Sequence, residues 1–278
     1  MKKISRRSFL AAAGLSVAAL ALTACGGSSA STASSVASSA SSAAASTSAA
    51  AGELTTVEAG KLTMATNAAF PPYEMTTDAG EFEGIDIETA QAIADKLGLE
   101  LQIDDMDFDA ALLSVQQGKA DIVMAGVTVT DERKAVMDFS DSYATGIQSI
   151  IVPEGSDIAS PDDLAGKKIG TQRGTTGYIY CSDDFGDDNV VAYDDGLTAV
   201  QALNNGQVDA VVIDNAPAKE FVAANPGLVI LDTSYAEEDY AIGMAKGSSL
   251  EDAVNATLEE LKADGTLQAI VDKYITAE

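Results

Sequence analysis

From Lys61 onward, short runs of β-branched and other apolar residues alternate with segments of helical periodicity. This alternation is typical of βαβ units, in which helices cover a mostly parallel sheet. The expected strands are 61–66, 99–103, 121–125, 148–153, 167–171, 190–193, 208–214, 228–231 and 240–245. The expected helices are 86–97, 108–117, 249–263, 267–274 and three that begin after Thr175, Gly196 and Ala216. About 215 residues is long for one doubly wound sheet, so the pattern predicts two α/β lobes.

The composition excludes several classes of function. Acidic residues outnumber basic ones 43 to 16, for a net charge of -27, so little could neutralise a nucleic-acid backbone. No histidine occurs, which removes Ser-His-Asp and Cys-His catalysis and the commonest catalytic metal ligand. Two cysteines, Cys25 and Cys181, are too few for a metal cluster. We therefore predict no metal, no cofactor and no nucleic-acid partner, and we interpret Cys181 as a small buried or semi-exposed residue.

The first residues are typical of an export signal. A basic start followed by an apolar run predicts a signal peptide over residues 1–24, too short to span a membrane. Arg6-Arg7 leaves the twin-arginine and the general export routes both open. Leu22–Cys25 resembles the lipobox of bacterial lipoproteins, which implies that Cys25 is acylated, with palmitate as one possible chain. Residues 25–58 then form the lipidated cysteine and a disordered linker rich in Ser and Ala.

A series of motifs resembles one known family. The segments are 67–74, 84–88, 120–133, 138–143, 174–176, 208–214 and 262–266, and they follow the family's order and spacing. Over about Lys61 to Tyr274 the chain is similar to the polar amino-acid substrate-binding proteins of ABC importers, the bacterial extracellular solute-binding proteins of family 3. The resemblance implies the type II periplasmic-binding-protein fold, in which two α/β lobes with mostly parallel sheets are joined by a two-strand hinge. It places residues 59–148 and 242–278 in the first lobe and residues 149–241 in the second.

The same resemblance implies a function. It describes a monomeric, non-enzymatic protein outside the cytoplasm, tethered to the cell membrane by the lipid on Cys25. Such a protein binds a free amino acid and delivers it to an ABC permease. Two alternatives stay open from the sequence. One is a dehydratase of the cyclohexadienyl type, in which a carboxylate would be the base; the other is a ligand-sensing lipoprotein.

A zwitterionic ligand needs a fixed cation and a fixed anion in one site. Arg133 suits the first role, because its planar guanidinium binds a carboxylate bidentately; alternatively it is a surface residue paired with Asp131 or Glu132. Asp214 follows an apolar strand and precedes a helix, where open α/β sheets bind ligands; alternatively it is a helix N-cap. The resemblance assigns Arg133 to the ligand carboxylate and Asp214 to the α-ammonium.

Smaller contributions are predicted around this pair. The resemblance gives Thr128 a hydroxyl contact, and the Gly126 carbonyl could accept a second ammonium proton. Thr175 and Thr176 open a helix after Gly174, and free N–H groups at a helix start favour an anion, here the ligand carboxylate. The alternative is a simple turn from strand to helix.

The side-chain pocket is predicted from four further residues. The resemblance places Phe70 and Phe108 beside the ligand side chain. We expect Phe70 in a loop, because Pro71-Pro72 follows it, whereas Phe108 could equally be a core residue. Asn67 stands where many relatives that bind cations carry an acid, and Gln172 precedes the second-lobe glycine. These two favour a neutral polar or acidic ligand, or cystine, over a cationic one.

Overall fold

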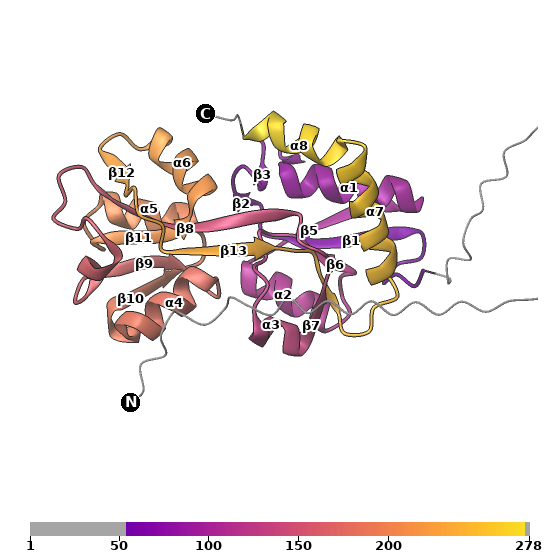
Figure 1. Cartoon of the computed structure of the whole chain (residues 1–278), viewed down its shortest axis with the longest axis horizontal. Coiled ribbons are helices and arrows are strands. Elements are labelled where there is room, and N and C mark those ends of the chain that lie inside the picture. Colours follow the sequence, from indigo (N-terminus) through magenta and orange to yellow (C-terminus); the bar gives the residue numbers. More distant parts are fainter. Residues whose placement is uncertain (1–53, 276–278) are drawn as a thin grey trace, which may run out of the picture. The chain divides into compact units, whose positions relative to one another are not determined.

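The computed structural model describes residues 54–275. The predicted signal peptide, Cys25 and most of the Ser/Ala-rich linker lie outside the described residues. The described chain builds two larger sheets, each with flanking helices, and a separate three-stranded sheet (Figure 1). Among the described helices, none combines the length and the apolar character needed to cross a membrane.

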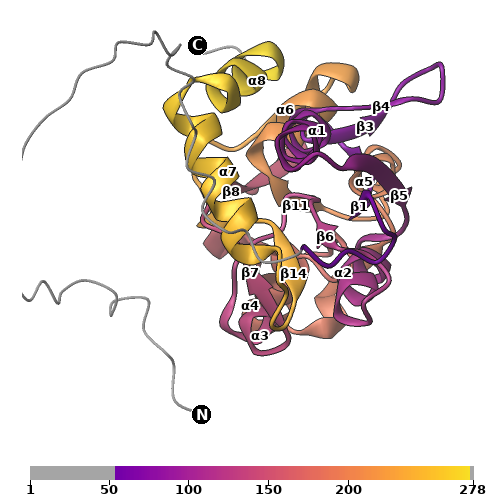
Figure 2. The same ribbon diagram turned by 90° about the vertical axis from the view of Figure 1, so that its right-hand side faces the viewer.

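The first lobe is built around a five-stranded sheet. Its strands are β1 (Lys61–Thr66), β5 (Glu100–Asp105), β6 (Ile122–Val123), β7 (Met137–Phe139) and β14 (Gly243–Ala245), in the order β5-β1-β6-β14-β7. The helices are α1 (Ile85–Leu97), α2 (Phe108–Gln116), α3 (Asp131–Val136), α7 (Glu251–Ala263) and α8 (Thr266–Tyr274). α1 buries Ile85 and Ile93 and ends at Gly98, which adopts the left-handed conformation. α7 and α8 pack against α1 (Figure 2).

The second lobe surrounds another sheet. Its strands are β8 (Ala144–Pro153), β9 (Ile169–Gln172), β10 (Val190–Tyr193), β11 (Ala210–Asp214) and β12 (Leu228–Ile230), in the order β10-β9-β11-β8-β12, and β13 (Ala236–Tyr240) also pairs with β8. The helices are α4 (Thr176–Phe185), α5 (Gly196–Asn204) and α6 (Asn215–Ala224), with 3₁₀ turns at Pro161–Leu164 and Asp187–Asn189. Cys181 is buried in this lobe, where burial raises the pKa of its thiol to about 12.

The third sheet corrects the prediction for Phe70. It consists of β2 (Ala69–Phe70), β3 (Glu74–Thr76) and β4 (Phe82–Glu83), all antiparallel. Pro71-Pro72 does form a turn, in which the Tyr73 N–H donates to the Phe70 carbonyl at 3.0 Å. Phe70, however, is the last residue of β2 and packs in the hydrophobic core. The prolines therefore mark the end of a short strand, not a longer loop around Phe70.

Two long strands run side by side between the lobes. β8 and β13 pair antiparallel, from Ala144 opposite Tyr240 to Gln148 opposite Ala236 (Figure 1). The expected single strand 240–245 is wrong: β13 ends at Tyr240, and β14 begins at Gly243 in the other sheet. Both sheets are mostly parallel, as predicted, and each contains one reversed strand: β14 runs antiparallel to its neighbours in the first sheet and β8 in the second. The lobe boundaries given above stay a prediction.

Candidate functional site

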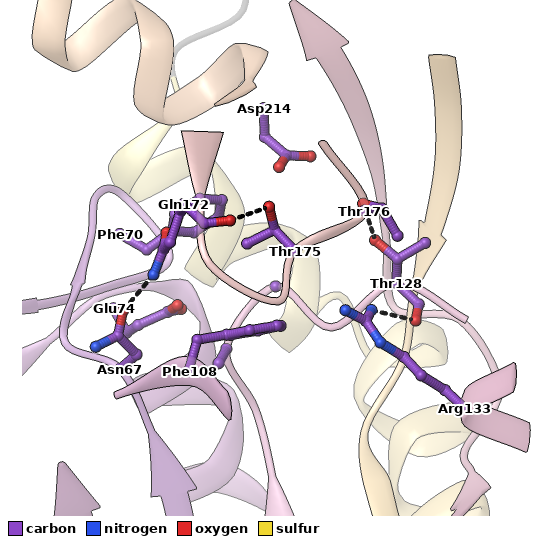
Figure 3. A pocket seen from close by; sticks show the side chains of 12 residues that line it. Asn67, Phe70, Glu74, Phe108, Thr128, Arg133, Gln172, Thr175, Thr176 and Asp214 are labelled. Atoms are coloured by element: carbon purple, nitrogen blue, oxygen red, sulfur yellow. Dashed lines mark hydrogen bonds between the residues drawn. The ribbon is translucent and has the colours of Figure 1, made fainter. Parts of the chain in front are cut away.

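A pocket lies where the carboxyl ends of β1, β6, β9 and β11 meet. Open α/β sheets bind ligands at this edge. The structure brings all ten predicted pocket residues to it, from both lobes: Asn67, Phe70, Phe108, Gly126, Thr128, Arg133, Gln172, Thr175, Thr176 and Asp214. Two residues that the sequence did not single out, Glu74 and Ala125, also line it. Figure 3 shows Arg133, Thr128 and Thr176 on one side and Asn67, Glu74 and Gln172 on the other.

Arg133 is buried at the edge of this pocket, so the alternative of a surface ion pair is wrong. Its guanidinium donates to the Thr128 carbonyl at 2.8 Å and to the Gly174 carbonyl at 3.1 Å. It also stacks over the Phe108 ring, 5.4 Å from the ring centre. Two of its five N–H groups are thereby used, and the others are available to an anion. Burial lowers the pKa of Arg133, as expected for a cation removed from water.

Asp214 supplies the opposite charge from the end of β11. It occupies the N-cap position of α6, but its side chain makes no capping hydrogen bond. Instead its carboxylate accepts from the Tyr240 hydroxyl and, at 2.8 Å, from the Gln148 amide. Burial raises the pKa of Asp214 to about 7, and the nearby Glu238 adds to the rise. Each carboxylate oxygen keeps one acceptor position for a ligand.

The turn before α4 caps the helix and also borders the pocket. Thr175 is the N-cap: its hydroxyl oxygen accepts from the Tyr178 N–H at 3.3 Å and its hydroxyl donates to the Gln172 carbonyl at 2.8 Å. The turn therefore fixes the helix start, as the simpler alternative held. Thr175 and Thr176 also line the pocket, and binding of the ligand carboxylate by the N–H groups of this helix start stays a prediction.

Thr128 and Thr176 face each other across the lobes. Their hydroxyl oxygens lie 3.4 Å apart, and both are within hydrogen-bonding distance of Glu238. Gly126, two residues before Thr128, has φ of 55°. A Cβ there would lie 2.9 Å from the Phe70 ring, so the position requires glycine both for its conformation and for space.

Asn67 and Gln172 form a contact between the lobes. The Gln172 amide donates to the Asn67 side-chain oxygen at 2.9 Å, and the Asn67 amide donates to the Met106 carbonyl at the same distance. Both side chains are buried. The two residues predicted to select the ligand side chain are therefore in one hydrogen-bonded chain.

Glu74 is the unexpected feature of this end of the pocket. The residue is fully buried, and its carboxyl oxygens accept no hydrogen bond from an N–H or O–H donor among the residues that the structure describes. Burial, together with the neighbouring Asp86 carboxyl group, to which a protonated Glu74 can donate a hydrogen bond, raises the pKa of Glu74 well above its usual range. A buried carboxyl group with a raised pKa that lines a cavity is a marker of a binding site.

Three residues behind the pocket wall were also missed from the sequence: Gln148 on β8, and Glu238 and Tyr240 on β13. They contact pocket residues and do not line the pocket themselves. Glu238 and Tyr240 are two positions apart, as inward-facing residues of a strand must be. The segment around them, Ala-Glu-Glu-Asp-Tyr, carries too few apolar residues to be identified as a strand.

Known proteins resemble the chain over almost all of its described length. The family model "Bacterial extracellular solute-binding proteins, family 3" matches residues 62–277. The L-cystine-binding protein TcyJ of Escherichia coli (strain K12) is 33% identical over 226 residues, which cover 80% of this chain and 85% of that protein. The arginine-binding extracellular protein ArtP of Bacillus subtilis (strain 168) is 33% identical, covering 78% and 87%. A crystal structure of the arginine-, lysine-, histidine-binding protein ArtJ from Geobacillus stearothermophilus superposes with a TM-score of 0.75 at 34% identity, covering 78% and 96%.

Proposed function

Because the chain belongs to the bacterial extracellular solute-binding proteins of family 3, we propose that it binds a free α-amino acid in this pocket and delivers it to the permease of an ABC importer. The observation that carries the proposal is the pairing of a buried cation, Arg133, with a buried anion, Asp214, in one pocket between the lobes. Relatives with binding-protein names favour this function over the dehydratase alternative. We further propose that the protein acts as a monomer.

The α-carboxylate and α-ammonium of the ligand would be bound by protein groups that still have unused hydrogen-bond donors or acceptors. The free N–H groups of Arg133 and the first N–H groups of α4 suit the ligand carboxylate. The free acceptor positions of Asp214 suit the ammonium, with the Thr128 hydroxyl and the Gly126 carbonyl as further acceptors. A zwitterion is costly to bury unless both charges are paired, and this arrangement pairs both.

For the ligand side chain, the sequence favoured a neutral polar or acidic amino acid, or cystine, because Asn67 stands where cation-binding relatives carry an acid. Glu74 provides a carboxyl group beside Asn67 (Figure 3). We therefore propose a side chain that donates hydrogen bonds, which retains the neutral polar and cystine candidates and disfavours an acidic one. Arginine is a second candidate, supported by the buried carboxyl groups of Glu74 and Asp86 at this end of the pocket and by the arginine-binding relative.

A calorimetric screen of the free amino acids tests this selection. Glutamine, cystine or arginine should bind at least about 30-fold more tightly than glutamate, because a glutamate side chain would meet the buried Glu74. Glu74→Gln should reduce that preference, because an amide cannot ionise beside a donating side chain and can itself donate a hydrogen bond to an acid. Glu83→Gln, an exposed change on β4, is the matched control. Tightest binding of glutamate by the wild-type protein would refute the proposed side-chain class.

The location outside the cytoplasm and the lipid anchor are also proposals here, since Cys25 lies outside the described residues. Two signals support them: the lipobox-like Leu22–Cys25 and the membership of an extracellular family. We expect globomycin to block processing and Cys25→Ser to release the protein from the membrane fraction. Cys181→Ser should leave it there, because that cysteine is buried in the second lobe. Membrane retention of the Cys25→Ser protein would contradict the anchor.

A further inference from the structure

Glu238 is a buried carboxylate on β13, one of the two strands that run between the lobes. One of its oxygens, Oε2, lies 3.2 Å from the Thr128 hydroxyl and 2.9 Å from the Thr176 hydroxyl. The Gln148 amide donates to the same oxygen at 3.0 Å. The Tyr180 hydroxyl also interacts with this carboxylate. Three donors from three different elements therefore converge on one carboxylate oxygen.

This convergence favours one arrangement of the hydroxyl protons. A carboxylate oxygen is a stronger acceptor than a second hydroxyl 3.4 Å away, so the favoured arrangement has each threonine directing its single hydroxyl proton at Glu238. Each hydroxyl oxygen then has only lone pairs left for the pocket that both threonines line. A hydroxyl in this state accepts a proton from an ammonium group but cannot donate one to a carboxylate.

We propose that Glu238 is a positioning residue that makes Thr128 and Thr176 acceptors for the ligand's α-ammonium. It holds one hydroxyl from each lobe in this state, and Gln148 connects it to Asp214, the charged acceptor for the same group. The inference rests on the proposed function, because it presupposes an amino-acid ligand. It goes further because Glu238, which does not line the pocket, is given the role of keeping both hydroxyls as hydrogen-bond acceptors toward the ligand.

The direct test is Glu238→Gln. A glutamine side chain can donate as well as accept, so at least one threonine is free to turn its hydroxyl proton into the pocket. We expect this variant to bind L-glutamine and L-arginine about 10- to 100-fold more weakly than wild type in calorimetry. The α-hydroxy acid analogues of the same two amino acids should lose less than about 3-fold, because their hydroxyl can either donate or accept. Glu237→Gln, the exposed neighbour on the same strand, should leave both classes of ligand unchanged.

A second variant keeps the test decisive if Glu238→Gln folds poorly. Thr176→Val removes one acceptor, keeps the side-chain volume and leaves the carboxylate in place. It should show the same selective loss for amino acids over hydroxy acids. In the double variant the combined loss should be smaller than the product of the single losses, since both changes remove one interaction.

The outcomes separate this inference from the proposed function. If wild type binds an amino acid and folded Glu238→Gln binds it equally well, the positioning role is wrong and the proposed function stands. Equal losses for amino acids and hydroxy acids would likewise assign Glu238 a purely structural role. If wild type binds no amino acid, both the proposed function and this inference fall.

Discussion

Arg133→Ala should weaken amino-acid binding by about 2–5 kcal/mol, which is roughly 30- to 4,000-fold in Kd. The expected loss is large because the guanidinium is buried and makes hydrogen bonds to carbonyls of both lobes. Its removal deprives a buried ligand carboxylate of its counter-charge, which neither water nor a neighbouring lysine can replace. Isothermal titration calorimetry with the tightest-binding amino acid measures the effect.

Two further variants show which property of Arg133 matters. Arg133→Lys keeps the charge but lacks the planar fork, so an intermediate loss is expected. Lys134→Ala removes the adjacent exposed charge and should change the affinity little. Because Arg133 also binds the Thr128 and Gly174 carbonyls, circular dichroism should confirm that each variant folds. A folded Arg133→Ala protein within 3-fold of wild-type affinity would contradict the assigned role.

Local sequence pattern predicted those strands that stay within one sheet. The strands expected at 61–66 and 190–193 have those limits in the structure, because each is an apolar, β-branched run inside one sheet. The strand expected at 240–245 failed for the opposite reason: the chain leaves one sheet at Tyr240 and joins the other at Gly243. Periodicity describes which side of a strand is buried, not which strand lies beside it.

Local sequence pattern also explains which residues of the site were predicted and which were missed. Arg133, Thr176 and Asp214 lie at the ends of strands or the starts of helices, where sequence signals are strong. Glu238 contributes through contacts with Thr128 and Thr176, residues 110 and 62 positions away along the chain. Such a contact follows from the antiparallel pairing of β13 with β8, which an acidic segment without apolar alternation does not predict.

The affinity for an amino acid should depend strongly on pH, because Asp214 must be ionised to bind the ligand's ammonium group. In the ligand-free protein burial raises the pKa of this carboxyl to about 7, so below that pH it is mostly protonated. An ammonium ligand needs the ionised form, and binding must therefore expel a proton. We expect the affinity to be level just above pH 7 and to fall by up to about tenfold per pH unit below it. Glu74 and Asp86 are also buried and have raised pKa values, so a fall steeper than tenfold per pH unit would show that binding expels a proton from one of them as well.

Asp214→Asn should separate binding from stability. An amide cannot neutralise the ammonium, so about 2–5 kcal/mol of binding free energy is lost. The stability effect has the opposite sign. Because folding raises the pKa of Asp214 from 3.8 to about 7, the folded state loses stability progressively as the pH rises between these two values, and the loss is complete above pH 7. The asparagine variant escapes this cost, so its ligand-free form should melt at a higher temperature than wild type at pH 8, and the difference should be smaller at pH 5.

Calorimetry between pH 5 and 8, with thermal melts at both limits, measures both effects. The wild-type affinity should rise with pH in step with proton release, which titrations in buffers of different ionisation enthalpy detect directly. Asp209→Asn, an exposed residue of the same strand region, should change neither the affinity nor its pH profile. Wild-type affinity that stays constant down to pH 5 would show that Asp214 is already ionised without ligand. A melting temperature lowered by Asp214→Asn at pH 8 would show that its bonds to Tyr240 and Gln148 outweigh the cost of the buried charge.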